Sequence, residues 1–184
     1  LRTVLSAAAT DWKGAKRHIR DPQSERRTQI AFIDVSRAYF NAQRDPNVDP
    51  VYVDLPAEDP DKDRDMVGLL LVHLCGARAA ADGWHCEYSG FLGELGFVRG
   101  DASACIFRHH TQNIVCSVHG DDFTSSGPKT SLDWMKTKME EKYELTESAR
   151  LGPSPQDDKE VRVLNRTVRW TTEGVEYEAD PRHV

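Results

Sequence analysis

One apolar segment that ends in an acid constrains the fold of this chain more than any other feature. The segment Gln29–Val35 (QIAFIDV) is rich in strand-forming residues and carries a single acid, Asp34. Apolar, β-branched and aromatic residues favour strands, so a buried strand is expected here. A charge at the end of a buried strand costs free energy unless another group pairs with it. Asp34 therefore needs a partner elsewhere in the chain.

Two adjacent acids, Asp121 and Asp122, follow a second apolar segment, 113–118, which is also expected to be a strand. Side chains alternate between the two faces of a strand, so neighbouring acids within one cannot point the same way. The run His119-Gly120-Asp121-Asp122 is typical of a tight turn, where this constraint relaxes. One of the two acids can then face a cleft beside Asp34.

The remaining pattern predicts helices and strands in alternation. Helices are expected over 1–10, over 36–42 (one or two turns, capped by Ser36), over 77–95 and from Ser126 to about 142. Strands are expected over 104–108, 159–170 and 175–179, and loops over 11–27 and 54–65. The segment 66–75 is expected to be either a strand or a buried helix. This order indicates an α+β fold in which helices cover one face of an antiparallel sheet.

Composition narrows the class of protein. The 184 residues suit a single domain, and 24 basic against 30 acidic residues argue against a module held to nucleic acid by bulk charge alone. No stretch approaches the roughly 18 apolar residues of a membrane span. The four cysteines form no close pair, which favours reduced thiols in an intracellular protein. The chain begins with Leu1, and we expect it to be a piece of a longer protein.

Converging carboxylates point to a divalent metal. Two or three acids that meet without a nearby base repel one another, and Mg²⁺ relieves that repulsion because it prefers hard oxygen ligands. Two such ions about 4 Å apart activate the attacking oxygen and stabilise the leaving one in phosphoryl transfer. The alternative is that Asp34 caps a helix and that Gly120-Asp121-Asp122 is only a turn. Spacing alone leaves both interpretations open.

Several motifs, in order, resemble copia-type retrotransposon reverse transcriptases. Residues 32–42 (FIDVSRAYFNA) are similar to the first catalytic motif of that family, and 74–84 (LCGARAAADGW) to its Leu-Tyr-Gly-Leu-Lys-Gln-Ala-Pro-Arg-Ala-Trp segment. Residues 118–123 (VHGDDF) stand where the family has Tyr-Val-Asp-Asp. The opening helix, 1–9, and the segment 101–107 continue the likeness, which covers nearly the whole chain.

The resemblance implies the antiparallel, palm-type sheet of a polymerase, with part of the fingers, in one domain spanning 1–184. It implies an RNA-directed DNA polymerase that uses two Mg²⁺ ions, with Mn²⁺ as a substitute, and that acts on deoxynucleoside triphosphates and a primed RNA or DNA template. The remainder of a Pol polyprotein would be its partner, and a cytoplasmic particle or the nucleus its location, with no membrane association.

The same resemblance assigns roles to individual residues. Asp34, Asp121 and Asp122 would be catalytic, with Asp34, Asp121 and the carbonyl of Val35 as metal ligands. The nucleotide-binding residues would be Tyr39, under the incoming sugar, together with Gly76 and Arg78. Core packing is the alternative for Tyr39. Apart from the resemblance, the positive charge of Lys13, Lys16 and Arg17 makes them candidates for contacts with a nucleic-acid backbone, and a solvated loop explains them equally well.

The chain also departs from the family pattern. His119 and Gly120 replace the residues before the acid pair, and Cys75, Ala79, Ala81 and Asp82 change the segment that should line the nucleotide. Three functions therefore stay open: the polymerase, a catalytically inactive remnant or nucleic-acid-binding module that keeps the fold, and another metal-dependent phosphotransferase or nuclease.

Other conspicuous side chains have simpler interpretations. His109 and His110 are expected in a polar turn, and Cys105 and Cys116 as small core residues. The set His73, Cys75, His85 and Cys86 lacks the close cysteine pair of a zinc site. The acids of 54–65 are expected to form a solvated insertion.

Overall fold

The computed structural model describes residues 1–10, 27–45, 50–77 and 79–179. They belong to two compact units, one made of Leu1–Ser36 with Leu92–Val184 and the other of Arg37–Phe91. The first unit holds the acids Asp34, Asp121 and Asp122. The second holds a small two-stranded ribbon.

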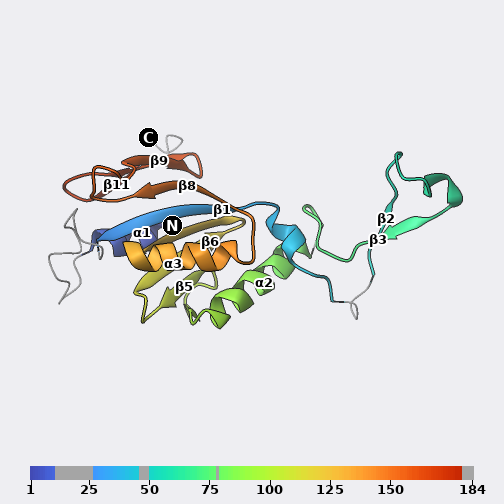
Figure 1. The fold of residues 1–184 in the computed structure, drawn as a ribbon, viewed down its shortest axis with the longest axis horizontal. Coiled ribbons are helices and arrows are strands. Elements are labelled where there is room, and N and C mark those ends of the chain that lie inside the picture. The colour runs from blue at the N-terminus through green and yellow to red at the C-terminus, as the bar shows by residue number, and fades with distance from the viewer. Residues whose placement is uncertain (11–26, 46–49, 78, 180–184) are drawn as a thin grey trace. The chain divides into compact units, whose positions relative to one another are not determined.

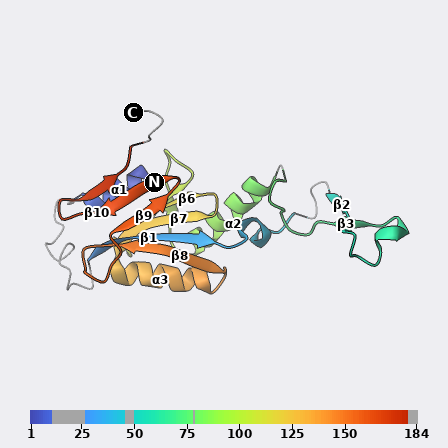
Figure 2. The same cartoon turned by 90° about the horizontal axis from the view of Figure 1, so that it is seen from above.

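The first unit contains a six-stranded antiparallel sheet in the order β4-β5-β6-β7-β1-β8. Figures 1 and 2 show this sheet from two directions. Its strands are β1 (Thr28–Val35), β4 (Val98–Arg99), β5 (Ile106–His109), β6 (Ile114–His119), β7 (Asp122–Pro128) and β8 (Leu145–Leu151). A separate three-stranded sheet comprises β9 (Glu160–Val163), β10 (Arg166–Trp170) and β11 (Val175–Tyr177). This mixed architecture with an antiparallel sheet confirms the predicted α+β class.

Strand β1 is covered on both faces, which explains its unbroken apolar sequence. It pairs with β7 on one edge and with β8 on the other. Ile30 and Phe32 belong to a core cluster with Val4, Leu5 and Ala8 of helix α1 (Arg2–Ala9). Helix α1 therefore packs on the face of the sheet that carries the even-numbered residues of β1.

Helix α3 (Lys129–Glu140) lies on the opposite face. Its Asp133 pairs with Arg150, and Lys136 lies 2.9 Å from a carboxylate oxygen of Glu147. Arg150 and Glu147 stand opposite the odd-numbered residues Ala31 and Ile33 of β1. The prediction that the helices cover a single face is therefore wrong, because β1 is apolar on both sides and each side needs cover.

Two strands replace elements predicted otherwise. Strand β7 runs to Pro128, whereas a helix was expected from Ser126; Ser126 pairs instead with Ile30 of β1 and with Val115 of β6. Pairing on both edges outweighs the weak strand preference of the Ser-Gly-Pro run. Strand β8 was not predicted at all. The segment 159–170 is not one strand but the hairpin β9–β10, which turns at Leu164 and Asn165, both with positive φ.

The second unit begins with the 3₁₀ helix η2 (Ala38–Asn41), preceded by Arg37 in the left-handed conformation (φ 52°). Ser36 is not its cap, because Arg37 takes that position and no side chain bonds the helix start. Strands β2 (Tyr52–Asp54) and β3 (Val67–Leu69) form the ribbon, and η3 (Lys62–Arg64) lies in the intervening loop. Of the two alternatives expected for 66–75, the structure has a strand, the short and exposed β3, and not a buried helix.

Helix α2 (Ala80–Glu94) ends where the sequence predicts. Gly96, with φ +92°, provides the left-handed residue that commonly follows a helix. Nε2 of His109 lies 3.0 Å from the carbonyl oxygen of Leu95, and its Nδ1 accepts a hydrogen bond from the amide of Gln112. Both ring nitrogens of His109 are thus engaged in holding this corner, not in a ligand site.

The four cysteines are all free thiols. Cys116 is buried in β6, and burial raises its pKa to about 12, so it behaves as the predicted small core residue. Cys105 is exposed, and its predicted core role is wrong. In the part of the chain that the structure describes, no helix combines the length and the apolar character needed to cross a membrane.

Candidate functional site

The register of the sheet brings two of the predicted acids together. Asp34, near the end of β1, stands directly opposite Asp122, the first residue of β7. Opposed residues of an antiparallel pair point to the same face, with their Cβ atoms about 4.5–5.5 Å apart. Both side chains are half-buried and lie on the α1 face of the sheet, in line with Ile30 and Phe32.

Asp121 lies in the turn next to this pair. His119 and Asp122 close a two-residue loop, Gly120-Asp121, in which Gly120 has φ +64°. A positive φ at the first loop position alone is the pattern of a type II′ hairpin turn. The amide of Val35 donates a 3.1 Å hydrogen bond to the carbonyl oxygen of Asp121. The end of β1 is therefore tied to the turn that carries the second and third acids.

The negative charges of these acids repel one another. Burial raises the pKa of Asp34, and the nearby charge of Asp121 raises it further. Burial also raises the pKa of Asp122, with further contributions from Asp121 and Asp34, while His119 acts in the opposite direction. Among the described residues, no lysine or arginine contributes to either pKa shift. Like charges held together in this way are a feature of metal and active sites.

A hollow of about 470 Å³ opens beside Asp122. Its polar lining includes Ser117, His119, Asp122 and Thr124 of β6 and β7, together with Arg2, Thr3 and Ser103. Val163 and Leu164, at the β9–β10 turn, form part of its apolar wall, and α1 contributes its first residues. The acid-bearing face is thus partly roofed by this turn and by α1, and the space that remains is lined by both hydroxyl and carboxylate groups.

The donor atoms at this site suit Mg²⁺, which binds through one or two carboxylates and completes its shell with water and substrate phosphates. Among the described residues, however, the His, Cys, Asp and Glu side chains form no group of three or more placed to hold a metal ion. Asp34, Asp121 and Asp122 lie in the same region of the sheet, but their side chains do not converge on a single metal position. The chemistry of the donors fits the ion, and a complete protein cage is not present.

The other predicted site residues lie apart from this region or outside the description. Val35 is buried at the end of β1, next to Asp34. Tyr39, half-buried in η2, and Gly76, exposed with φ +88°, belong to the second unit. Arg78 and the basic residues Lys13, Lys16 and Arg17 lie outside the described residues. The structure therefore describes the predicted metal ligands, but not the predicted nucleic-acid contacts.

Sequence reasoning missed the hydroxyl groups of Ser117 and Thr124 beside the acids. The two residues are opposed in the β6–β7 pair, but serine and threonine are too common in strands to give a signal. It also missed Leu164 at the rim. An Asn following Leu164 within an alternating run is a turn signal that could have found the β9–β10 hairpin.

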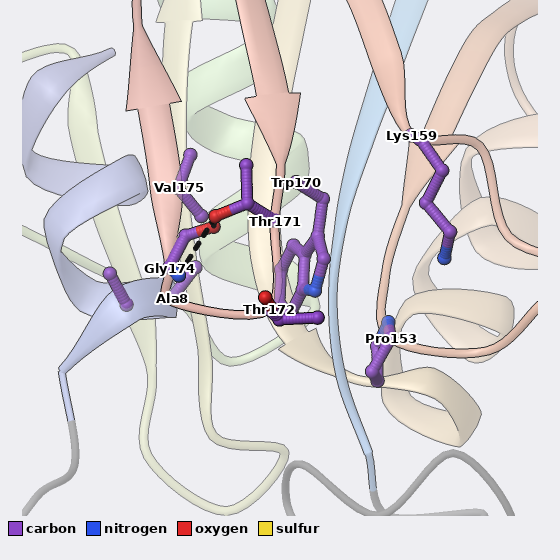
Figure 3. Close-up of a pocket in the computed structure, with 9 residues that line it drawn as sticks. Ala8, Pro153, Lys159, Trp170, Thr171, Thr172, Gly174 and Val175 are labelled. Atoms are coloured by element: carbon purple, nitrogen blue, oxygen red, sulfur yellow. Dashed lines mark hydrogen bonds between the residues drawn. The ribbon is translucent and has the colours of Figure 1, made fainter.

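A second hollow, of about 460 Å³, lies between the end of α1 and the β10–β11 turn, with Trp170 and Val175 in its wall (Figure 3). Two of its polar side chains, Lys159 and Thr171, hold the surrounding loops. Lys159 donates 2.6 Å hydrogen bonds to the carbonyls of Gly152 and Ser154, and Thr171 accepts one from the amide of Gly174. Among the described residues no acid lines this hollow, so the candidate site is the acid-bearing face instead.

Comparison with protein-family models and with curated proteins finds no match to this chain.

Proposed function

We propose that the chain is the palm, with part of the fingers, of a copia-type reverse transcriptase, and that it catalyses RNA-directed DNA synthesis. The observation that carries the proposal is the opposition of Asp34 and Asp122 across β1 and β7, with Asp121 in the adjoining turn. A polymerase of this kind needs carboxylates from two separate segments at one edge of a sheet. The resemblance of the motifs suggests the reaction, and the pairing of β1 with β7 supports a site to which both acid-bearing segments contribute.

In this proposal Asp34, Asp121 and the carbonyl of Val35 hold two Mg²⁺ ions, and Asp122 is the second acid of the pair. The bound ions would lower the pKa of the primer 3′-hydroxyl and neutralise the charge that develops on the α-phosphate. The protein positions the reacting groups, which is most of what phosphoryl transfer requires.

The β6–β7 hairpin would set the position of Asp121. Its two-residue loop allows little freedom, and the hydrogen bond from Val35 to the carbonyl of Asp121 joins the two acid-bearing segments. Tyr39 would exclude a 2′-hydroxyl and so favour deoxynucleotides, with Gly76 and Arg78 beside the nucleotide. Lys13, Lys16 and Arg17 would hold the phosphate backbone of the template and primer.

Primer extension on an RNA template tests the proposal. The wild-type chain, Asp34→Asn, Asp121→Asn and the exposed control Asp101→Asn are compared with Mg²⁺ and deoxynucleotides, and circular dichroism checks that each variant is folded. We expect extension by the wild type and the control, and at least about a 100-fold loss in the two site variants.

The other two functions are outcomes of the same assay. No extension by the folded wild type, alone or with upstream fingers sequence restored, would identify the inactive remnant. Degradation of the template without added nucleotides, lost in Asp121→Asn, would identify a nuclease.

A further inference from the structure

The β2–β3 ribbon presents an uncovered apolar face. Tyr52 stands opposite Leu69, and Asp54 opposite Val67, so these four side chains share one face. Tyr52, Val67 and Leu69 are 58%, 54% and 50% exposed. Three large apolar side chains at half exposure or more, side by side on two short strands, form a contiguous patch of the kind that marks interaction sites.

The opposite face of the ribbon is covered by the ribbon's own residues. Gly68 stands opposite Val53 on that face. A Cβ atom at Gly68 would lie 3.3 Å from Leu55 Cδ2 and 3.4 Å from Val53 Cγ2. Leu55 and Val53 thus pack close to the glycine, and within the two strands the exposed large apolar side chains are Tyr52, Val67 and Leu69.

Both edges of the ribbon are open among the described residues. The sheet contains only β2 and β3, and the hydrogen bond from the Leu70 amide to the Val51 carbonyl extends the pairing between the same two segments. An isolated two-stranded ribbon is marginally stable in water, and unpaired strand edges are templates for another strand. A third strand would satisfy the backbone groups and cover the apolar face.

The loop that joins the strands is strongly acidic. From Asp54 to Asp65 the chain carries six acids and two bases. Arg64 is already paired with Asp61 at 2.9 Å, whereas Glu58, Asp63 and Asp65 are exposed. This charge repels a phosphate backbone and attracts a cationic polypeptide, so it selects against nucleic acid as the occupant.

From these features we propose that the ribbon is a docking site for a protein partner that adds an extended strand with alternating apolar and basic side chains. The apolar side chains would cover Tyr52, Val67 and Leu69. The basic side chains would lie near Asp63 and Asp65, and the partner's backbone would pair with an open edge. This inference is independent of the proposed polymerase activity.

A fluorescein-labelled nine-residue peptide of alternating valine and lysine serves as the probe, and its binding is followed by fluorescence anisotropy. We expect saturable binding with a Kd of about 1 µM to 1 mM, as for weak and transient contacts. Val67→Ser should weaken it about 10-fold, the value of one buried apolar side chain. The matched control is Val98→Ser, a 58% exposed valine on the two-residue strand β4, and it should leave the Kd unchanged.

Two further probes separate charge from backbone pairing. The near-isosteric double variant Asp63→Asn, Asp65→Asn should weaken binding about threefold or more at low salt, an effect that vanishes at high salt. A peptide with a central proline should bind at least about 10-fold more weakly, because proline lacks the amide donor.

Other results would overturn the proposal. These are no saturable binding, equal weakening by Val67→Ser and Val98→Ser, or a single-stranded RNA oligonucleotide that competes with the peptide for the ribbon. Concentration-dependent self-association abolished by Val67→Ser would assign the face to a second copy. A melting temperature lowered by Val67→Ser but not by Val98→Ser, without peptide, would assign it to the chain itself.

Discussion

Asp34 on β1 and Asp122 on β7 stand directly opposite each other and carry like charges on the same face of the sheet. Opposed like charges destabilise a strand pair. No lysine or arginine forms an ion pair with either acid in the part of the chain that the structure describes. Such a costly arrangement is typical of sites whose acids serve a ligand, since function often opposes stability there.

Removing one of these charges is expected to stabilise the protein. The pKa values of Asp34 and Asp122 are raised in the folded state, chiefly by burial and then by the neighbouring acids. The folded protein therefore binds protons more tightly than the unfolded chain, and the free energy of unfolding falls as the pH rises from about 3.9 through the raised values. Asp122→Asn should raise the free energy of unfolding by about 0.2–1 kcal/mol at pH 7.

Urea unfolding at pH 7 and at pH 3, without divalent ions, measures this difference. The gain should be present at pH 7 and absent at pH 3, where the wild-type carboxyl is protonated as well. Asp101→Asn, at an exposed position, provides the control. If Asp122→Asn were less stable than the wild type at pH 7, the claim that Asp34 and Asp122 repel each other in the folded state would be contradicted.

Replacing Gly83 in α2 by a larger residue is expected to destabilise the protein. A Cβ atom there would lie 2.3 Å from the ring of His73, which is 8% exposed. Gly83→Ala should therefore lower the free energy of unfolding by about 1–3 kcal/mol, as overpacking does. In the same helix nothing lies within 4 Å of a Cβ at Gly90. Gly90→Ala should gain about 0.5–1 kcal/mol from helix preference alone.

Thermal and chemical unfolding of the two alanine variants decides this prediction. The double variant Gly83→Ala, His73→Ala removes the ring that the new methyl group would meet. Its loss in free energy of unfolding should be smaller than the sum of the losses measured for Gly83→Ala and His73→Ala alone. Equal gains from both glycine substitutions would show that His73 does not pack where the structure places it.

Asp157 is expected to hold the β8–β9 loop against the start of β1. Its carboxylate accepts hydrogen bonds from Gln29 at 2.7 Å and from the Ser154 amide at 2.9 Å, and it pairs with Arg27 at 3.6 Å. The side chains of Arg27 and Asp157 are 10% and 7% exposed. Asp157→Ala should cost about 1–3 kcal/mol, because it leaves the Gln29 side-chain amide and the Ser154 backbone amide without the carboxylate that accepts their hydrogen bonds.

Equilibrium unfolding in urea measures this cost, with Asp101→Ala as the control, which should change stability by less than about 0.5 kcal/mol. A cost below 1 kcal/mol for Asp157→Ala would mean that solvent replaces the lost contacts and that the loop is not anchored through this residue.

Parts of the fold follow from local sequence. The buried strand β1, the end of α2 at Gly96 and the tight turn at Gly120 were all predictable, because each depends on residues close together in the chain. Strand β7 was not fully predictable. Its end at Pro128 depends on β1 and β6 pairing on either side, and such long-range pairing overrides weak local preference.

The candidate site shows the same division. Asp34 and Asp122 stood out because acids interrupt or follow apolar strands. Their direct opposition depends on the β1–β7 register, which no local pattern reveals. The hydroxyl groups of Ser117 and Thr124 lie beside them only because the β6–β7 hairpin brings the two strands into register.

The central claim is that Asp34 and Asp121 hold a common divalent ion, and titration with Mn²⁺ followed by electron paramagnetic resonance of the free ion tests it most directly. The account predicts saturable binding by the wild-type chain and by Asp101→Asn, competed by Mg²⁺ and weakened at least about 10-fold by Asp34→Asn and by Asp121→Asn. Binding that is absent in the wild type, or equally strong in all four proteins, would contradict it.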